Sequence, residues 1–193
     1  MSKAFKASDF RVGMEMEFQL VDASDFDLVD GVLPFLDVYQ DSPNVKAEFI
    51  QNTIEVASDA CEDVGALDEN MRHYLRDLIP RAADLGMRLC GAGTHPFSTR
   101  LASITPMPRF LAMEQVSGLM SHSQITFATH VHMGMPSGGE AVLLMSELKP
   151  SLPILIALSA NSPYWRGSET GFAAYRQRIL AASRSYGLPP DFV

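Results

Sequence analysis

Two glutamates separated by one residue are the sharpest chemical feature of the sequence. Residues 12–20 alternate between apolar and polar side chains, and Glu15, Glu17 and Gln19 fall on the polar side. In a β-strand, residues i and i+2 project from the same face about 7 Å apart. The pattern therefore predicts a strand with two neighbouring carboxylates, which repel each other unless a cation lies between them. The alternative is a solvent-facing sheet surface, which is common in antiparallel sheets.

Two further segments carry polar residues in the same alternating pattern. Residues 48–57 predict a second strand with Glu55 on its polar face, and residues 124–133 predict another on which His130 and His132 share a face. If these faces belong to one sheet, carboxylates and imidazoles converge there. Carboxylates favour hard cations such as Mg²⁺ or Mn²⁺, and imidazole ligands shift the preference towards Mn²⁺. Hydrogen-bonded structural histidines are the alternative.

A segment near the C-terminus carries residues that could bind an anion. Residues 159–167 include Asn161 and Arg166, and Arg176 follows on a predicted amphipathic helix. Arginine suits a planar carboxylate or a phosphate because its guanidinium donates hydrogen bonds in a fork. A helix end that runs into a proline- and glycine-containing turn would give the same sequence without any ligand.

A glycine-containing segment follows a predicted third strand over residues 87–93. It reads Gly91-Ala92-Gly93-Thr94-His95-Pro96. Glycines at the end of a strand allow the backbone to approach a ligand closely. The spacing matches neither the dinucleotide-binding fingerprint nor a Walker loop, so it does not by itself indicate a nucleotide. A structural turn containing His95 is the alternative.

The rest of the sequence predicts helices that would hold these strands in place. Asp63 and Gly86 are typical N-cap and C′ residues for a helix between them, in which Pro80 predicts a kink or a break. Residues 151–161 are apolar and predict a buried helix. Strands with one polar face combined with separate helices indicate an α+β fold with an antiparallel sheet. The helices are expected over 64–85, 108–121, 137–150, 151–161 and 170–185.

The composition is that of one globular domain. The chain has 193 residues, of which 47% are hydrophobic, with a mean hydropathy of +0.04. A net charge of −8 argues against nucleic-acid binding. The apolar stretch 152–158 is too short to cross a bilayer, and residues 1–10 contain no apolar core of a secretory signal. We therefore expect a cytoplasmic protein without a membrane partner, in which Cys61 and Cys90 are buried and reduced.

Five motifs together resemble the type 2 glutamate–cysteine ligase family, also called carboxylate–amine ligases. They occur in the family's order, at 13–22, 54–57, 91–97, 129–134 and 158–167, the last followed by Thr170-Gly171 and Tyr175-Arg176. The resemblance runs from about residue 10 to the C-terminus. The first motif reads Glu-Met-Glu where the family often has three consecutive acidic residues, and we expect Met16 to point into the core. Family members are longer, so the chain matches their N-terminal half.

The resemblance implies a glutamine synthetase-like fold: a curved antiparallel sheet with flanking helices and metal ions on its concave face. The chain would be a single, incomplete domain over residues 1–193. The implied activity is ATP-dependent ligation with Mg²⁺ or Mn²⁺, in which a substrate carboxylate, typically that of glutamate, is phosphorylated and then attacked by an amine. The implied metal ligands are Glu15, Glu17, Glu55 and His130. The implied substrate-binding residues are Thr94, His132, Asn161, Arg166 and Arg176, and Glu15, Glu17 and Arg166 would be catalytic.

The resemblance also implies partners. Amino acids are the implied small-molecule substrates. In longer family members, the C-terminal half supplies further strands, another metal-binding glutamate and basic residues for the nucleotide. An incomplete sheet exposes strand edges that pair with other chains, so we expect a homo-oligomer or a second chain that completes the sheet. Two other functions stay open: a shortened, non-catalytic binding or assembly module, and a metal-dependent amide hydrolase that needs no ATP.

Overall fold

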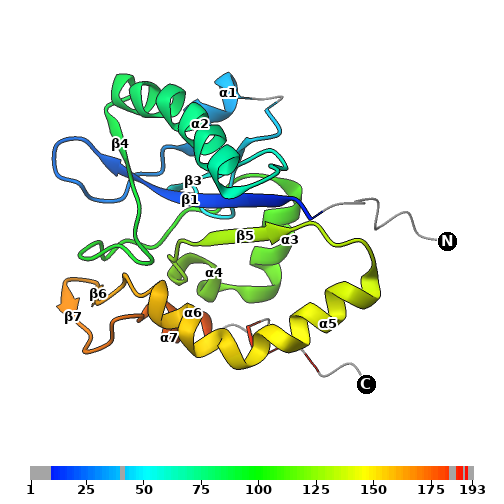
Figure 1. The fold of residues 1–193 in the computed structure, drawn as a ribbon. Coiled ribbons are helices and arrows are strands. Elements are labelled where there is room, and N and C mark those ends of the chain that lie inside the picture. Colours follow the sequence, from blue (N-terminus) through cyan, green and yellow to red (C-terminus); the bar gives the residue numbers. More distant parts are fainter. Residues whose placement is uncertain (1–9, 40–41, 183–185, 189, 191–193) are drawn as a thin grey trace.

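A five-stranded antiparallel sheet forms the centre of the protein (Figure 1). The computed structural model describes residues 10–39, 42–182, 186–188 and 190. The long first strand pairs with β3 along one edge and with both β4 and β5 along the other, and β2 pairs with β3 at the far side. The strands are β1 (Val12–Asp22), β2 (Val45–Ala47), β3 (Thr53–Ala57), β4 (Met87–Cys90) and β5 (Thr129–Met133).

The side chains of β1 alternate between two faces, as the sequence predicts. Phe18 and Leu20 are buried in an apolar core that also contains residues of α2 (Val64–Asp84), and Met16 packs against this core as expected. Figure 1 shows α2 lying across this face of the sheet. Glu15 and Glu17 project from the opposite face. The mixture of helices with an open antiparallel sheet confirms the predicted α+β class.

Local signals in the sequence account for both ends of α2. The carboxylate of Asp63 accepts a hydrogen bond of 2.8 Å from the backbone N–H of Ala66, as an N-cap does. Gly86 follows the helix with a φ of +71°, the left-handed conformation that glycine adopts most easily. The helix continues through Pro80, so the predicted break does not occur.

A second apolar cluster supports the far side of the sheet. It contains Val21 at the end of β1 together with residues of the segments around α3 (Pro108–Ser117) and α4 (Leu119–Ser123). The other members of the second cluster are Leu28, Ile50, Ala102, Ile104, Phe110, Ile125 and Phe127.

A short helix, α1 (Val32–Val38), contributes to the first core.

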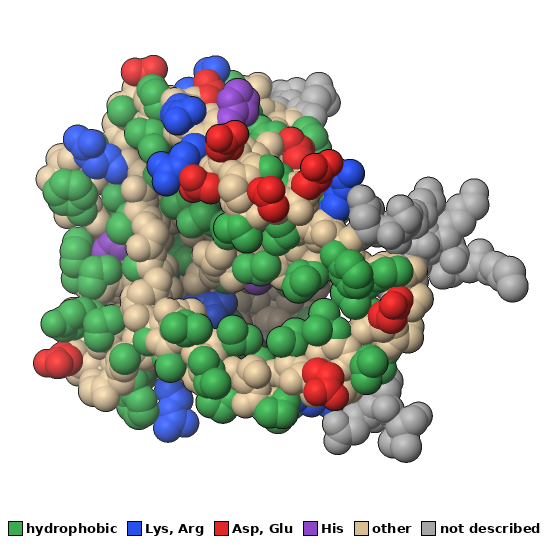
Figure 2. Space-filling model, in the orientation of Figure 1, with side chains coloured by type: hydrophobic (Ala, Val, Ile, Leu, Met, Phe, Trp, Pro, Cys, Tyr) green, Lys and Arg blue, Asp and Glu red, His purple; other side chains and the backbone are tan. Residues whose placement is uncertain are grey.

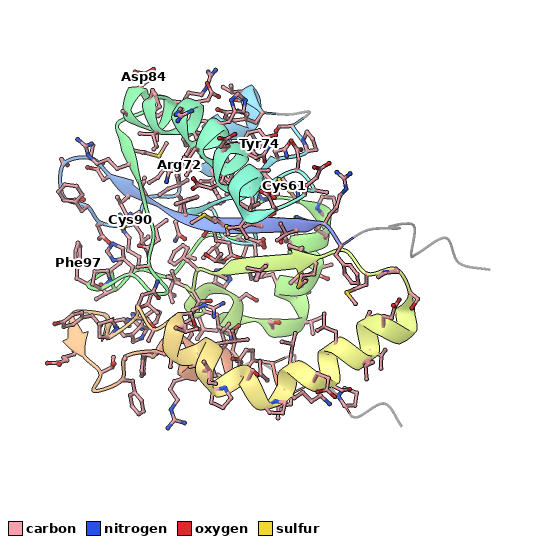
Figure 3. All side chains as sticks on the ribbon, in the orientation of Figure 1. Cys61, Arg72, Tyr74, Asp84, Cys90 and Phe97 are labelled. Carbon is pink, nitrogen blue, oxygen red and sulfur yellow. The ribbon has the colours of Figure 1, made fainter. Side chains whose placement is uncertain are left out.

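Three predicted strands are shorter than expected. The predicted strand 48–57 begins only at Thr53, because a turn at residues 51–52 reverses the chain and residues 45–47 form a separate strand. β4 ends at Cys90 and β5 begins at Thr129, where 87–93 and 124–133 were predicted. Cys61 and Cys90 are both free thiols, but Cys90 is exposed, so the prediction that it is buried was wrong (Figure 3).

The helices after β5 are exposed or half-buried. α5 (Gly138–Leu148), a short 3₁₀ turn η1 (Lys149–Ser151) and α6 (Leu152–Leu158) contain no buried residue, so the predicted burial of 151–161 was wrong. Together they form a stretch of 21 residues that contains an 18-residue window with a mean hydropathy of 1.6, and by length and composition alone this stretch could cross a membrane. The expectation that no segment could cross a bilayer was based on residues 152–158 alone and was too narrow.

The C-terminal part is a small hairpin and a short helix. The hairpin pairs β6 (Tyr164–Trp165) with β7 (Ser168–Glu169). The last helix, α7 (Arg176–Leu180), is shorter than the predicted 170–185, of which residues 183–185 lie outside the described part of the chain.

Candidate functional site

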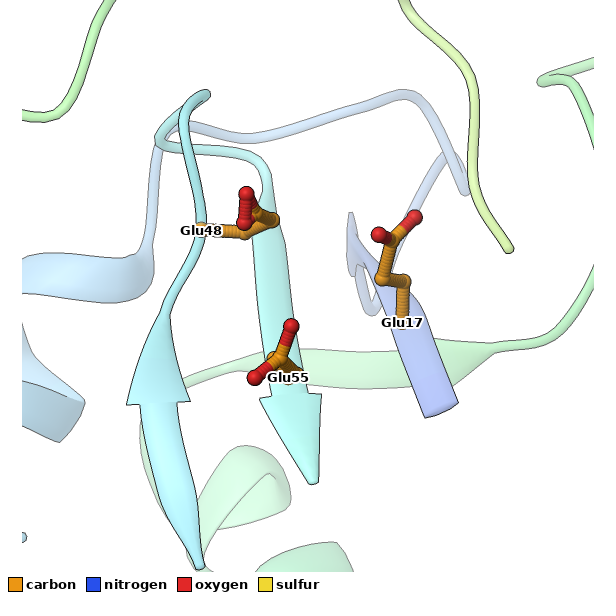
Figure 4. Close-up of side chains that lie close together, drawn as sticks. All are labelled: Glu17, Glu48 and Glu55. Atoms are coloured by element: carbon orange, nitrogen blue, oxygen red, sulfur yellow. The ribbon is translucent and has the colours of Figure 1, made fainter. Parts of the chain in front are cut away.

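Three carboxylates gather on the face of the sheet opposite α2. Glu17 and Glu55 stand directly opposite each other on β1 and β3. Glu48 joins them from the segment that follows β2 (Figure 4). One carboxylate oxygen from each residue lies within 4.8 Å of the other two, and all three side chains are half-buried. The ammonium group of Lys46 lies 3.6 Å from a carboxylate oxygen of Glu55 and offsets part of the negative charge.

The environment of the cluster opposes its ionisation. Burial and the neighbouring carboxylate of Glu48 raise the pKa of Glu17 from 4.5 to about 7, although the backbone N–H of Ala128 donates a 2.7 Å hydrogen bond to Glu17. Burial also raises the pKa of Glu48, and Glu55 adds to the effect. A divalent cation would remove this conflict, and oxygen donors at this spacing suit a hard cation.

Glu15 has different partners, although it lies only two residues away on the same face. His132 Nε2 lies 3.0 Å and His130 Nδ1 lies 3.4 Å from the same carboxylate oxygen of Glu15. Burial acts to raise the pKa of Glu15, but the hydrogen bonds from the two histidines outweigh it and the pKa is lowered. The predicted set of four metal ligands is therefore divided: Glu17 and Glu55 join Glu48, whereas Glu15 contacts His130 and His132.

Arg176 faces the carboxylate cluster from the first turn of α7. Glu17 and Arg176 both line a cavity of about 280 Å³ that also contains Glu48 and His130. Burial lowers the pKa of the Arg176 guanidinium, and the carboxylate of Glu17 acts in the opposite direction. The Nε of Arg176 is buried and has no hydrogen-bond partner among the described residues. A buried, unpaired N–H next to an open cavity can donate to an anion.

A second cavity, of about 340 Å³, shares the side chains of Glu17 and Arg176 with the first. Its walls include Glu17, Arg176, Asn161 and residues 91–93. The backbone N–H of Gly93 donates a 3.0 Å hydrogen bond to Asn161 Oδ1. A Cβ on Gly93 would lie 2.7 Å from that oxygen and 3.2 Å from the Cδ of Arg176. Glycine at position 93 therefore allows both side chains to pass close to the backbone.

Two predicted substrate-binding residues donate hydrogen bonds to backbone carbonyls. The hydroxyl of Thr94 is buried and donates a 2.9 Å hydrogen bond to the carbonyl of Tyr164. Arg166 is exposed and donates to the carbonyl of Thr99 at 2.7 Å. Neither residue lines the two cavities that contain Glu17. The structure therefore does not bring the predicted catalytic arginine, Arg166, to the carboxylates, and Arg176 occupies that position.

His95 is a structural residue. Its Nδ1 accepts a 3.0 Å hydrogen bond from the backbone N–H of Ser98, so its Nε2 carries the proton and donates to the carbonyl of Phe26 at 3.0 Å. The turn interpretation of this histidine therefore holds.

Glu48 is the site residue that the strand pattern missed. Glu48 lies two residues after Lys46, and the buried Ala47 separates them. This alternation over residues 46–48 could have indicated that Glu48 and Lys46 share the polar face of the sheet. Counting alternate residues back from Glu55 places Glu48 on the apolar face. The count fails because the turn at 51–52 lies between them.

Comparison with known proteins identifies the family of the chain. The profile of Glutamate-cysteine ligase family 2 (GCS2) matches residues 11–192. The chain belongs to this family. A protein of Trichormus variabilis, provisionally named glutamate–cysteine ligase 2, is 46% identical over 189 residues, which cover 97% of this chain and 49% of that protein. A similarly named protein of Mycobacterium sp. (strain KMS) is 34% identical and matches 94% of this chain with 48% of its own length.

The chain spans about half the length of these GCS2 relatives. Among solved structures, a glutamate–cysteine ligase from Francisella tularensis in complex with AMP is similar over 81% of this chain and 32% of its own, at 15% identity and a TM-score of 0.48. A likeness of that degree carries no argument about the site.

Proposed function

We propose that this chain carries the metal- and phosphate-binding part of an ATP-dependent carboxylate–amine ligase. The observation that supports this most is the cluster of Glu17, Glu48 and Glu55 with Arg176 on the adjacent wall, where the buried Nε of Arg176 has no hydrogen-bond partner among the described residues. Phosphoryl transfer needs cations and arginines placed around the transferred group. A protein with a net charge of −8 can hold ATP only where it supplies such groups locally.

The donor set fits Mg²⁺ or Mn²⁺. Three carboxylate oxygens within 4.8 Å of one another can surround one small hard cation. Bound there, the cation would neutralise negative charge on the transferred phosphoryl group. We assign Glu17, Glu48 and Glu55 as the principal ligands. Glu15 and His130, which lie beside the cluster, would be supplementary ligands. Donors from another segment would complete the coordination of the cation.

The chemistry proceeds in two steps. A carboxylate oxygen of the substrate, for which we propose glutamate, attacks the γ-phosphorus of ATP, the bond to the β–γ bridging oxygen breaks and ADP leaves. The amine nitrogen of cysteine or another amino acid then attacks the acyl carbon, the bond to the phosphate oxygen breaks, and the nitrogen loses a proton. The guanidinium of Arg176 donates to the anionic oxygens in both steps. Gly93 lets Asn161 and Arg176 lie close to the backbone, and His132 orients Glu15.

The proposal extends to the cellular location of the enzyme and to its partner chain. Two free thiols fit a reducing compartment, so we propose a cytoplasmic location. We also propose that a further polypeptide completes the sheet, as the exposed strand β5 suggests.

Calorimetric titration with Mg²⁺, alone and with ATP, tests the proposal on this chain. Glu48→Gln should weaken Mg²⁺ binding by about 10-fold or more, a loss typical of metal-site substitutions. The matched control is Glu69→Gln, because Glu69 is exposed on α2 and lies on the other side of the sheet. No saturable binding by the folded chain, or equal affinity in the two variants, would refute the metal assignment.

An activity assay distinguishes ligation from the alternatives. Hydroxylamine converts an acyl phosphate into a stable hydroxamate, so glutamate, ATP and hydroxylamine should give a hydroxamate together with ADP. Release of an amine from an amide without ATP would instead identify a hydrolase. Mg²⁺·ATP binding without either product, also when the half of the relatives that this chain does not match is added, would identify a binding module.

A further inference from the structure

The direction of the Arg176 side chain depends on its backbone. Its buried Nε has no hydrogen-bond partner among the described residues, and its Cδ lies so close to Gly93 that a Cβ there would be 3.2 Å away. Figure 2 shows that the molecule is hollowed on this side, between β5 and the helices that follow it. An arginine beside open space keeps its direction only where its backbone is fixed, because its side chain has many rotamers.

Ser162 makes three hydrogen bonds to the segment that leads into α7. Its backbone N–H donates to the carbonyl of Ala173 at 3.0 Å, and its carbonyl accepts from the N–H of Tyr175 at 3.2 Å. Its hydroxyl accepts from the backbone N–H of Arg176 at 3.1 Å. Ser162 is only 2% exposed, so water has little access to these bonds. This one residue therefore holds the chain over residues 173–176.

The sequence around Ser162 explains how it reaches α7. Pro163 follows it, and a residue before proline is restricted to an extended conformation. In that conformation Ser162 forms a parallel bridge with Ala174. The preceding residue, Asn161, accepts the 3.0 Å hydrogen bond from the backbone N–H of Gly93. Residues 161 and 162 thus connect the glycine segment of the cavity wall with the start of α7.

We propose that Ser162 is a positioning residue for Arg176. Its hydroxyl holds the backbone N–H of Arg176, which keeps the guanidinium on the wall that the two cavities share. The other end of α7 is held independently, because the amide of Gln124 donates to the carbonyl of Ile179 at 3.3 Å. Loss of the hydroxyl should therefore shift the start of α7 without detaching the helix. This inference rests on the proposed function, in which Arg176 donates to the anionic oxygens.

Direct binding of the anion by Ser162 is the competing explanation, because Ser162 also lines the 340 Å³ cavity. If its hydroxyl contacted the anion, the effects of losing the hydroxyl and losing the guanidinium would add. If the hydroxyl acts through Arg176, its loss should have no effect once the guanidinium has been removed. A double variant therefore separates the two roles.

Calorimetric titration of the 193-residue chain, with Mg²⁺ alone and with Mg²⁺·ATP, tests the inference. Ser162→Ala should weaken Mg²⁺·ATP binding by about 10-fold, the order of one hydrogen bond to a charged group. The affinity for Mg²⁺ alone should not change, because the carboxylates lie on other elements. Ser162→Thr keeps the hydroxyl and should bind like the wild type. In an Arg176→Gln background, Ser162→Ala should cause no further loss.

Ser121→Ala is the matched control. Ser121 is also 2% exposed, but it lies on α4 and its hydroxyl has no hydrogen-bond partner among the described residues. Hydrogen exchange then measures the contact without any ligand. The amide of Arg176 should exchange about 10-fold faster in Ser162→Ala than in the wild type, and at an unchanged rate in Ser121→Ala.

The outcomes separate this inference from the proposed function. A folded wild-type chain that binds no Mg²⁺·ATP contradicts the phosphate-binding part of the proposed function, and this inference with it. Where the wild type binds Mg²⁺·ATP, three results overturn the inference alone: equal Mg²⁺·ATP affinity in Ser162→Ala, an additive loss in the double variant, or unchanged exchange at the amide of Arg176. An equal loss of Mg²⁺ affinity in Ser162→Ala would also overturn it, because the effect would then not act through Arg176.

Discussion

Replacing Glu17 with glutamine should stabilise the metal-free protein at high pH. In the folded protein the pKa of Glu17 is about 7, against an ordinary value of 4.5, because burial and the carboxylate of Glu48 oppose its charge. Between these two pH values, the folded state keeps a proton that the unfolded state has released. Folding stability is therefore lost as the pH rises from about 4.5 to about 7, and the loss is complete above that range.

The structure sets the size of the effect. At about 1.4 kcal/mol for each pH unit, the difference between the two pKa values corresponds to about 3 kcal/mol of unfolding free energy. Glutamine has nearly the same shape and can still accept the hydrogen bond from Ala128, so the variant removes the charge and little else. Its advantage over the wild type should be below about 1 kcal/mol at pH 5 and about 3 kcal/mol at pH 8.

Urea unfolding with a chelator present, at pH 5, 6, 7 and 8, measures this difference. Glu69→Gln controls for the loss of an exposed carboxylate and should follow the wild type at every pH. Adding Mg²⁺ at pH 8 should recover the stability of the wild type and leave Glu17→Gln nearly unchanged. Parallel pH curves for wild type and Glu17→Gln would show that the cluster carries no such electrostatic conflict, and the argument for a cation site there would fail.

Two packing predictions can be checked by thermal or urea unfolding. Gly93→Ala should destabilise the protein by about 1–3 kcal/mol, because the new Cβ would lie 2.7 Å from Asn161 Oδ1. Gly91→Ala, with nothing within 4 Å, is the control, and an equal effect of both would contradict the close approach. Leu78→Ala should cost about 2–5 kcal/mol because Leu78, on α2, is fully buried in the core. The same substitution at the exposed Ile79 should cost well under 1 kcal/mol, and similar losses at 78 and 79 would show that α2 is placed in the wrong rotation.

Features that depend on local periodicity could be predicted from the sequence. The two-residue repeat of β1 places Glu15 and Glu17 on one face and Met16 on the other, whatever the rest of the chain does. The caps of α2 depend on single residues, Asp63 and Gly86, whose preferences act within one turn.

Features that depend on distant contacts could not be predicted. Glu48 reaches the cluster because a turn reverses the chain before β3, and alternation does not extend across a turn. Arg166 has a φ of +50° in the hairpin turn, which directs its side chain to the carbonyl of Thr99 and not to the carboxylates. The exposure of α6 shows that apolar composition predicts a need for burial but does not say which polypeptide provides it.

The pairing of β1 also limits how this site can diverge. The strand is held by β5 over residues 12–16, by β3 over 15–19 and by β4 over 19–22. A slip of one residue would exchange every carboxylate for an apolar side chain, so the backbone has no freedom to adjust to a new ligand. The positions of the carboxylates are thus preorganised before any substrate arrives. We expect changes in substrate choice during evolution to arise in the opposite wall, which helices and turns build and where one substitution can reshape a cavity without disturbing the sheet.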